Sequence, residues 1–435
     1  MAYLLRDATI ITLDPPSVQR ADLRIEDGRI AGRETQLAPQ NSDEVLNLGG
    51  RFIMPGMVCA HTHLYSTLAR GMPGPRRAPG NFNEILEFVW WRLDRALDEE
   101  TIYWSALAGA LEAAQAGTTC LYDHHASPYC IRGSLQIVRE AIERAGLRAV
   151  LCYEVTDRGG RKQRDDGIEE NRAFLEWVHS GPGTARFRAL VGAHASFTMS
   201  AGALEACVEL MRTYGSGIHI HAAEDPCDEE DARSKYGMGI MERLSRAEAL
   251  NEHAIIAHGT HLQKPAIDIG RAAGAWFAHN PRSNMNNRVG YAPVADFGER
   301  LLMGTDGLGA DLFAEADFAF YKGRDAGSGF EADQWLQVLA NNQRRASQDF
   351  GADLSSLAPG SAADLVVLSY QPPTLLTPGN LPWHLIFGMT SAHVESVMVD
   401  GNFVVTNRQP AADSANVYEH ARKAGEKLWA RIQGL

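Results

Sequence analysis

The feature that most limits the fold of this chain is a pattern in its central part, where short apolar runs alternate with stretches of helical periodicity. The runs are apolar on both faces, which is typical of buried parallel strands. Parallel strands need helical connections, and eight strand-helix units close a barrel. The predicted strands run from Phe52 to His61, Thr118 to Asp123, Arg148 to Val155, Phe187 to His194, Gly217 to His221, Ala254 to His258, Ala275 to His279 and Leu301 to Thr305. The sequence therefore predicts an α/β fold with a central (β/α)8 TIM-type barrel.

Both ends of the chain have a different character, because residues 1–50 and 360–405 carry short strand patterns separated by turn signals. Asp400-Gly401, for example, predicts a hairpin between two apolar segments. We expect both ends to pair into one small β-sandwich rather than to form two tandem domains. The predicted division is 1–54 and 359–411 for the sandwich, 55–358 for the barrel and 412–435 for a terminal helix.

Composition limits the class of partner. The 435 residues are 45% hydrophobic and 22% charged, as in an ordinary soluble protein, and the formal net charge is −13. That charge would repel a phosphate backbone and there is no basic stripe, so nucleic acid is not an expected partner. The six cysteines show no paired spacing, no apolar run reaches membrane-spanning length, and the first residues do not resemble a signal peptide. We expect a cytoplasmic protein without a membrane partner.

The first predicted barrel strand ends in His61-Thr62-His63. Side chains alternate along a strand, so both imidazoles point to the same side. A His-x-His pair alone is a weak signal, but further candidate ligands stand where later apolar runs end: His221, His258, His279 and Asp306. Imidazoles and a carboxylate at the ends of separate strands can converge on one zinc or iron ion.

Alternation leaves several orientations open. His219 and His221 share a strand face, so spacing alone does not say which one would bind an ion. Adjacent His124 and His125 cannot both face the barrel axis, and we favour His125 as a substrate contact. His194 ends the fourth strand and is either a substrate contact or a buried core histidine. His279 stands before Asn280-Pro281, where it can serve to shape a turn.

A long loop follows the His-x-His pair. Residues 71–83 are rich in Gly, Pro and Arg and precede a helical stretch that contains Phe88, Trp90 and Trp91. The position suits a lid over the site. For the aromatic side chains, packing against the barrel is the simpler interpretation and contact with a flat substrate the alternative.

With these positions in order, the chain resembles the amidohydrolase superfamily in its cytosine deaminase and chlorohydrolase branch. The segments Met72 to Pro79 and Asp123 to Pro128 resemble the SsnA-type aminohydrolases of that branch. The motifs that carry the wider resemblance are Pro55-Gly56-Met57 with His61-Thr62-His63, His221-Ala222-Ala223-Glu224, Ala257-His258-Gly259, His279-Asn280-Pro281 with Ser283-Asn284, Gly304-Thr305-Asp306, and the segment from Pro359 to Asp364.

The resemblance implies one divalent metal ion, zinc or iron, held by His61, His63, His221 and Asp306. Branches with two metals use a carboxylated lysine at the end of the fourth strand, and residues 186–200 contain no lysine. A single ion favours deamination of a small heterocyclic substrate. The resemblance also implies a homo-oligomer.

The expected roles follow from the chemistry of hydrolysis. Asp306 would accept the proton of the attacking water, and His258 would orient that water and stabilise developing charge. Glu224 would protonate the ring nitrogen beside the amine-bearing carbon and then help ammonia leave. His194 and His125 are the expected substrate contacts.

Two other functions remain open from the sequence. A chlorohydrolase would use the same ion on a halogenated ring, but chloride leaves without a proton, so Glu224 favours an amine. A metal-dependent binding protein without turnover, linked to selenium metabolism, is the alternative outside the enzymes.

Overall fold

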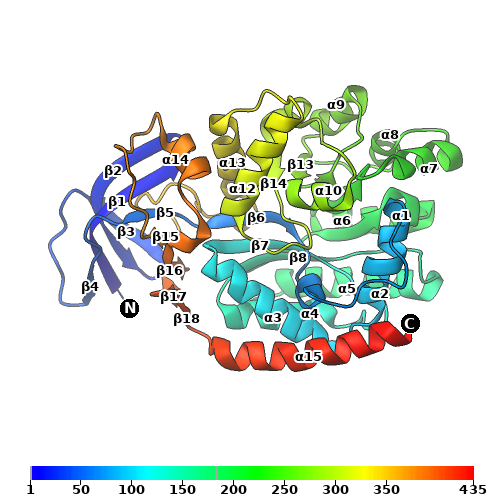
Figure 1. The fold of residues 1–435 in the computed structure, drawn as a ribbon, viewed down its shortest axis with the longest axis horizontal. Helices are drawn as coiled ribbons and strands as arrows, with labels where there is room; N and C mark the ends of the chain where they lie inside the picture. Colours follow the sequence, from blue (N-terminus) through cyan, green and yellow to red (C-terminus); the bar gives the residue numbers. More distant parts are fainter. Residues whose placement is uncertain (1, 182–184) are drawn as a thin grey trace.

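The computed structural model describes residues 2–181 and 185–435, and both ends of the chain contribute strands to one sheet, seen at the left of Figure 1. We call it the terminal sheet. Its order is β18 (Gln409–Pro410), β17 (Asn402–Thr406), β16 (Val394–Val399), β15 (Leu365–Leu368), β5 (Phe52–Pro55), β1 (Ala2–Leu13), β2 (Pro16–Glu26) and β3 (Arg29–Glu34), and β4 (Asp43–Asn47) pairs with β1. The two predicted strand-rich ends therefore meet through β5, which pairs with both β1 and β15.

The central part of the described chain forms the predicted parallel barrel. Its strands are β6 (Met57–Thr62), β7 (Thr118–His125), β8 (Arg148–Tyr153), β9 (Phe187–Ala189) continued by β10 (Val191–Ala195), β11 (Ile218–Ala222), β12 (Ile255–His258), β13 (Trp276–His279) and β14 (Leu301–Met303). Every pairing among them is parallel. Isolated parallel bridges Thr62–Asp306 and Val155–Ala193 join the two groups of strands into a closed barrel.

The first predicted strand is wrong in extent. The run from Phe52 to His61 is divided at Gly56 into β5 and β6, which belong to the terminal sheet and to the barrel respectively. The apolar pattern continues across the division because both strands are buried. A Cβ on Gly56 would lie 2.1 Å from the Thr119 hydroxyl oxygen, so close packing requires glycine where the chain passes between the two sheets.

Alternate residues of the barrel strands face opposite ways. Val58, Tyr122 and Cys152 belong to one buried cluster, which also contains residues of β12, β13 and β14. Their neighbours, such as Leu121 and Leu151, belong to the cluster that packs the helices onto the barrel. The strands are thus buried on both faces, as their composition predicts.

The connecting helices surround the barrel (Figure 1). The apolar stripes of α4 and α6 are buried as predicted from their 3.6-residue spacing. The longer helices are α3 (Glu99–Gln115), α4 (Ser134–Ala145), α5 (Arg161–His179), α6 (Ala201–Tyr214), α7 (Pro226–Tyr236), α8 (Ile240–Arg246), α9 (Lys264–Ala272), α10 (Pro281–Asn287), α12 (Leu312–Asp325), α13 (Ala332–Phe350), α14 (Leu381–Phe387) and α15 (Ser414–Gly434).

Short helical turns cover the carboxyl end of β6. They are η1 (Leu64–Ala69), α1 (Phe82–Ile85), the π-helical turn η2 (Leu86–Trp90) and α2 (Trp91–Arg95); others are η3 (Ser196–Thr198), α11 (Val294–Phe297), η4 (Gly298–Arg300) and η5 (Ser391–His393). Helix α15 runs along α3 and reaches α2, where the Arg92 guanidinium donates to the Ile432 carbonyl.

Among the described residues, no helix is both long enough and apolar enough to cross a bilayer.

Candidate metal and catalytic site

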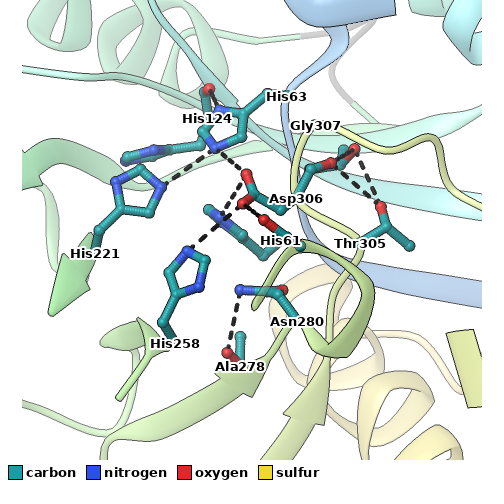
Figure 2. A network of polar contacts seen from close by, with 12 residues as sticks. His61, His63, His124, His221, His258, Ala278, Asn280, Thr305, Asp306 and Gly307 are labelled. Atoms are coloured by element: carbon teal, nitrogen blue, oxygen red, sulfur yellow. Dashed lines mark hydrogen bonds and ion pairs between the residues drawn. The ribbon is translucent and has the colours of Figure 1, made fainter. Parts of the chain in front are cut away.

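Histidines and one carboxylate from distant strands meet inside the carboxyl end of the barrel (Figure 2). His63 Nε2 lies 2.9 Å from Asp306 Oδ1 and 3.2 Å from His221 Nε2. Asp306 Oδ1 lies 3.8 Å from His61 Nε2, and Oδ2 lies 3.8 Å from His258 Nε2. Ligand bonds of about 2 Å would place neighbouring ligand atoms roughly 3 to 3.5 Å apart, so these separations suit one small cation.

The hydrogen bonds of the histidines show which nitrogen can bind an ion. His63 Nδ1 donates to the carbonyl of His124, and His221 Nδ1 donates to the carbonyl of His194 at 2.9 Å. In each neutral ring the proton is therefore on Nδ1, and Nε2 carries a lone pair. Two lone pairs facing each other at 3.2 Å repel unless a proton or a cation lies between them, and the pair of Nδ1-protonated rings therefore fits a metal ion.

Two further imidazoles support this interpretation. His258 Nδ1 donates to Asn284 Oδ1 at 2.8 Å, and its Nε2 is buried without a hydrogen-bond partner among the described residues. The same is true of Nε2 of His61. Ligand atoms of His61, His221, His258 and Asp306 lie within 4.8 Å of one another, and so do those of His61, His63, His124 and His221.

The choice between His219 and His221 depends on their surroundings. His219 Nε2 lies 2.9 Å from His61 Nδ1, on the side of that ring away from Asp306, whereas His221 Nε2 faces His63. His219 therefore orients His61, and His221 is the better candidate ligand. The ligand set His61, His63, His221 and Asp306 remains our prediction.

Backbone geometry helps to aim these groups. His258 and Asp306 have φ of 70° and 52°, and Ala223, just before Glu224, has φ of 49°. Non-glycine residues rarely adopt this left-handed conformation, and where they do it is often at functional sites. The strain therefore coincides with residues expected to act.

Asp306 and Glu224 differ in electrostatic environment. Burial opposes ionisation of Asp306. When no cation occupies Nε2 of His63, that nitrogen can carry a proton, and the hydrogen bond and charge of the protonated ring hold the pKa of Asp306 below the usual range. The Ser283 hydroxyl donates to its Oδ2. Burial, with a smaller contribution from the charge of Asp306, raises the pKa of Glu224. One carboxyl thus favours the ionised form and the other retains its proton more readily, which is how a site divides base from acid.

Glu224 lies on the loop between β11 and α7, at the edge of the metal cluster. Its Oε2 is 3.6 Å from His258 Nε2, and its Oε1 accepts a hydrogen bond from Asn287 Nδ2 at 3.1 Å. Asp225 next to it caps α7. The Glu224 carboxyl is therefore held near the cluster, although no sequence pattern had indicated Asn287.

A cavity opens beside the cluster and combines polar groups with an aromatic wall. The wall comes from the turns after β6, and includes Trp90 and Trp91, so contact with a flat ligand is open to these side chains. Of the predicted lid, residues 71–83, only Phe82 lines the cavity, and a closing motion stays a prediction. The lining residues are His63, Tyr65, Ser66, Phe82, Leu86, Trp90, Trp91, Asp94, Glu154, His194, Ala195, Phe197, His221, Glu224, Asp225, Asp228, Ser283, Asn286, Asn287, Asp306, Gly307 and Leu308.

The favoured orientation of the His124–His125 pair is corrected by the structure. His124 faces the metal cluster, as Figure 2 shows, with its Nδ1 3.1 Å from Glu154 Oε1. His125 instead lies 3.0 Å from the Ser127 hydroxyl and does not line the cavity. Residues 120, 122 and 124 share one face of β7, and Tyr122 is in the interior cluster, so His125 points outward.

The other predicted histidines also differ in whether they line the cavity. His194 lines the cavity, and burial lowers the pKa of its ring to about 3. His279 does not line it but stacks on Trp335, with ring centroids 5.9 Å apart. Glu154 was missed, although it directly follows the apolar strand β8 and is only 3% exposed. The rule that marked histidines at strand ends would have found it.

Comparison with known proteins identifies the family. The chain belongs to the amidohydrolase family, whose pattern matches residues 52–404. This confirms the predicted resemblance and the predicted fold class.

Two curated relatives match almost end to end. The chain is 28% identical to a 5'-deoxyadenosine deaminase of Methanothermobacter thermautotrophicus over 424 residues, covering 96% of both chains. It is 29% identical over 444 residues to a 5-methylthioadenosine/S-adenosylhomocysteine deaminase of Syntrophomonas wolfei, covering 98% of this chain and 99% of the relative.

Solved structures show the same fold at lower identity. An adenosine deaminase from Xanthomonas campestris with bound zinc has a TM-score of 0.85 at 20% identity, covering 100% of this chain and 99% of the other. The zinc complex of an atrazine chlorohydrolase from Arthrobacter aurescens has a TM-score of 0.83 at 22% identity, covering 97% and 100%. A guanine deaminase from C. acetobutylicum has a TM-score of 0.77 at 14% identity, covering 93% and 100%.

Proposed function

We propose that this protein is a metal-dependent hydrolase that deaminates an aminated heterocycle and releases ammonia. The observation that carries the proposal is the convergence of imidazole Nε2 lone pairs and the Asp306 carboxylate on one point beside Glu224, in a cavity with aromatic walls. Membership of the amidohydrolase family and the deaminase relatives support it.

We propose that one divalent ion is held by His61, His63, His221 and Asp306. Zinc is the first candidate, because solved relatives of the same fold contain it. When bound, such an ion lowers the pKa of a coordinated water to about 7 and so supplies hydroxide near neutral pH.

The protein groups around this point can move the protons that hydrolysis requires. Asp306 is ionised, so its carboxylate can accept the proton of the attacking water, and Ser283 fixes the carboxylate by donating to Oδ2. His258, fixed by Asn284, is placed to orient that water and to stabilise charge that develops on the substrate.

Glu224 supplies the acid. With its pKa raised by burial, it can protonate the ring nitrogen next to the amine-bearing carbon, which makes that carbon more electrophilic. Glu224, now a carboxylate, can then take the proton of the hydroxyl group on the tetrahedral carbon and pass it to the amine, so that the carbonyl forms and nitrogen leaves as ammonia. A chlorohydrolase would have no need of this second step, and Glu224 therefore favours deamination.

The substrate class rests on both the cavity and the relatives. Trp90, Trp91 and Phe197 offer aromatic surfaces to a planar ring. The relatives are named for purine nucleosides or their derivatives, so aminopurines and their ribosides are the first compounds to test. Pteridines, pyrimidines and triazines with an exocyclic amine form the rest of the panel.

The test is ammonia release by zinc-loaded protein across this panel, with Glu224→Gln as the diagnostic variant. The amide cannot transfer a proton, so we expect kcat to fall by about 10²- to 10⁴-fold with the zinc content unchanged. Glu112→Gln is the control, because Glu112 is paired with Arg70 on the surface. Tight binding of a ring without any ammonia would instead support a binding protein.

A further inference from the structure

Glu154 and His194 are two polar groups of the cavity wall that the proposed mechanism does not use. They lie on neighbouring strand ends, and only 3% and 7% of their surfaces are exposed. Glu154 Oε2 is 3.9 Å from His194 Nε2, which is too far for a hydrogen bond between them. Both atoms are therefore available to a ligand in the cavity.

The oxygen Oε2 of Glu154 is turned away from the histidines that surround the other oxygen of the carboxyl. His124 Nε2 donates to the His219 carbonyl at 3.0 Å, and His124 Nδ1 faces Glu154 Oε1 at 3.1 Å. Both His124 Nδ1 and His63 Nδ1, at 3.4 Å, lie on the Oε1 side of the carboxyl. Oε2 receives no hydrogen bond from the described residues, and it lies on the side of His194.

His194 presents an acceptor as well. Its Nδ1 lies 2.8 Å from the Thr198 hydroxyl, which itself donates to the Ala195 carbonyl at 3.0 Å. Because that hydroxyl proton is already used, Nδ1 must be the donor, and Nε2 of the neutral ring keeps its lone pair.

The two acceptors are held in place by the strands behind them. Asn171 accepts from the backbone N–H groups of Tyr153 and Gly192 at 2.9 and 3.2 Å, and donates to the Tyr153 carbonyl at 2.8 Å. His194 N donates to the Val155 carbonyl at 3.0 Å. This pairing fixes the ends of β8 and β10 together, so the acceptors are ordered before any ligand binds.

We propose that Glu154 Oε2 and His194 Nε2 form a paired acceptor site that selects heterocycles with a second hydrogen-bond donor, an amino group or ring N–H, besides the amine that leaves. The inference rests on the proposed function and narrows its substrate class. A donor group between the two atoms satisfies both acceptors, whereas a ring edge with lone pairs leaves them buried and unpaired.

Binding of matched purines to zinc-loaded protein tests the proposal. The pairs are adenine with 2,6-diaminopurine, and adenosine with its 2-amino derivative. Each compound is titrated calorimetrically at a pH or a low temperature at which turnover is slow. We expect the diamino member of at least one pair to bind about tenfold more tightly or better, the effect of one hydrogen bond to a charged group.

Variants separate recognition from support of the fold. Glu154→Met removes both oxygens and should abolish the preference for the diamino member. Glu154→Gln should retain it, because its amide nitrogen can donate to His124 Nδ1 while its oxygen takes the place of Oε2. Zinc content and circular dichroism establish that each variant is intact. If Glu154→Met does not fold, His194→Phe replaces it and should likewise abolish the preference for the diamino member.

Equal binding within both pairs by the wild type would overturn the proposal. So would equal weakening of both members in an intact Glu154→Met protein, since that result would mean a structural role only. Ammonia release is measured separately. Its absence with every compound would contradict the proposed deaminase, whereas the ratio of affinities within a pair would still decide this inference.

Discussion

At the scale of single residues, the orientation of each histidine is decided by the hydrogen bond at its other nitrogen. His221 is directed at the candidate metal point through His194, and His219 contacts that point only by way of His61. The two histidines share a strand face, so their difference lies in their partners and not in their position along the sequence.

Metal content should therefore distinguish the two. The His221→Ala protein should no longer bind zinc at one ion per chain, because the variant removes a ligand. His219→Ala should weaken zinc binding by about 10- to 100-fold, but its site should still become occupied at excess zinc. Elemental analysis after dialysis against graded zinc concentrations measures both. The reverse result would assign the ligand role to His219.

Asp228 makes the pH dependence of folding testable. Its oxygens accept from the N–H groups of Phe197 and Ala223, yet burial raises its pKa to about 7 from roughly 3.9 in an unfolded chain. The folded state thus binds the proton more tightly, and the stability associated with it is present below pH 4 and is lost as the pH rises to 7.

When the pH rises from 5 to 8, deprotonation of Asp228 alone should lower the free energy of unfolding by about 2 to 3 kcal/mol. In Asp228→Asn that contribution disappears, so the fall in stability from pH 5 to pH 8 should be smaller than in the wild type. Urea unfolding at both pH values measures this. If Asp228→Asn loses as much stability between pH 5 and pH 8 as the wild type does, Asp228 is not the cause of the loss.

At the scale of elements, strand existence and strand ends were predictable because the barrel strands are apolar on both faces. It was less predictable which side chains of each strand face the interior of the barrel. The pairing of β6 with β7 is irregular between Cys59 and Thr62, and the division at Gly56 is not visible in the apolar pattern. His124 could have been assigned by counting alternate residues from Tyr122, whose aromatic ring belongs inside.

The close approach of β8 and β10 depends on one glycine. A Cβ on Gly192 would lie 2.2 Å from the carbonyl oxygen of Tyr153, next to Glu154. Gly192→Ala should therefore push the strands apart and cost about 1 to 3 kcal/mol. Gly202→Ala is the matched control, because no atom lies within 4 Å of its Cβ and alanine favours helix α6.

Thermal or urea unfolding measures both glycine variants. We expect Gly192→Ala to lose stability and also to bind purines more weakly, since the two acceptors move with their strands. A Gly192→Ala protein as stable as Gly202→Ala would show that the strands can separate at little cost.

At the scale of the whole molecule, the barrel and the terminal sheet are joined by a buried ion pair. Arg148 of β8 binds Asp364, just before β15, through two hydrogen bonds of 2.8 and 3.0 Å, and it also contacts Asp400 at 3.0 Å. The side chains of Arg148 and Asp364 are 5% and 1% exposed, so the pair is shielded from water.

Removal of one partner should be costly. Asp364→Ala leaves a buried guanidinium with less compensation, and we expect a loss of about 3 to 5 kcal/mol, less whatever Asp400 recovers. The double variant Arg148→Met with Asp364→Leu should regain part of that loss. Glu419→Gln breaks an exposed pair with Lys423 and should leave the free energy of unfolding nearly unchanged.

The sequence by itself determined the barrel, the strand-rich ends and the candidate ligands, because these depend on apolar periodicity and on polar residues at strand ends. The tertiary structure decided what depends on neighbours far along the chain. It separated His221 from His219, turned His124 inward and brought Glu154 beside His194. Those outcomes follow from hydrogen bonds and packing between different strands, and no local pattern in one strand contains them.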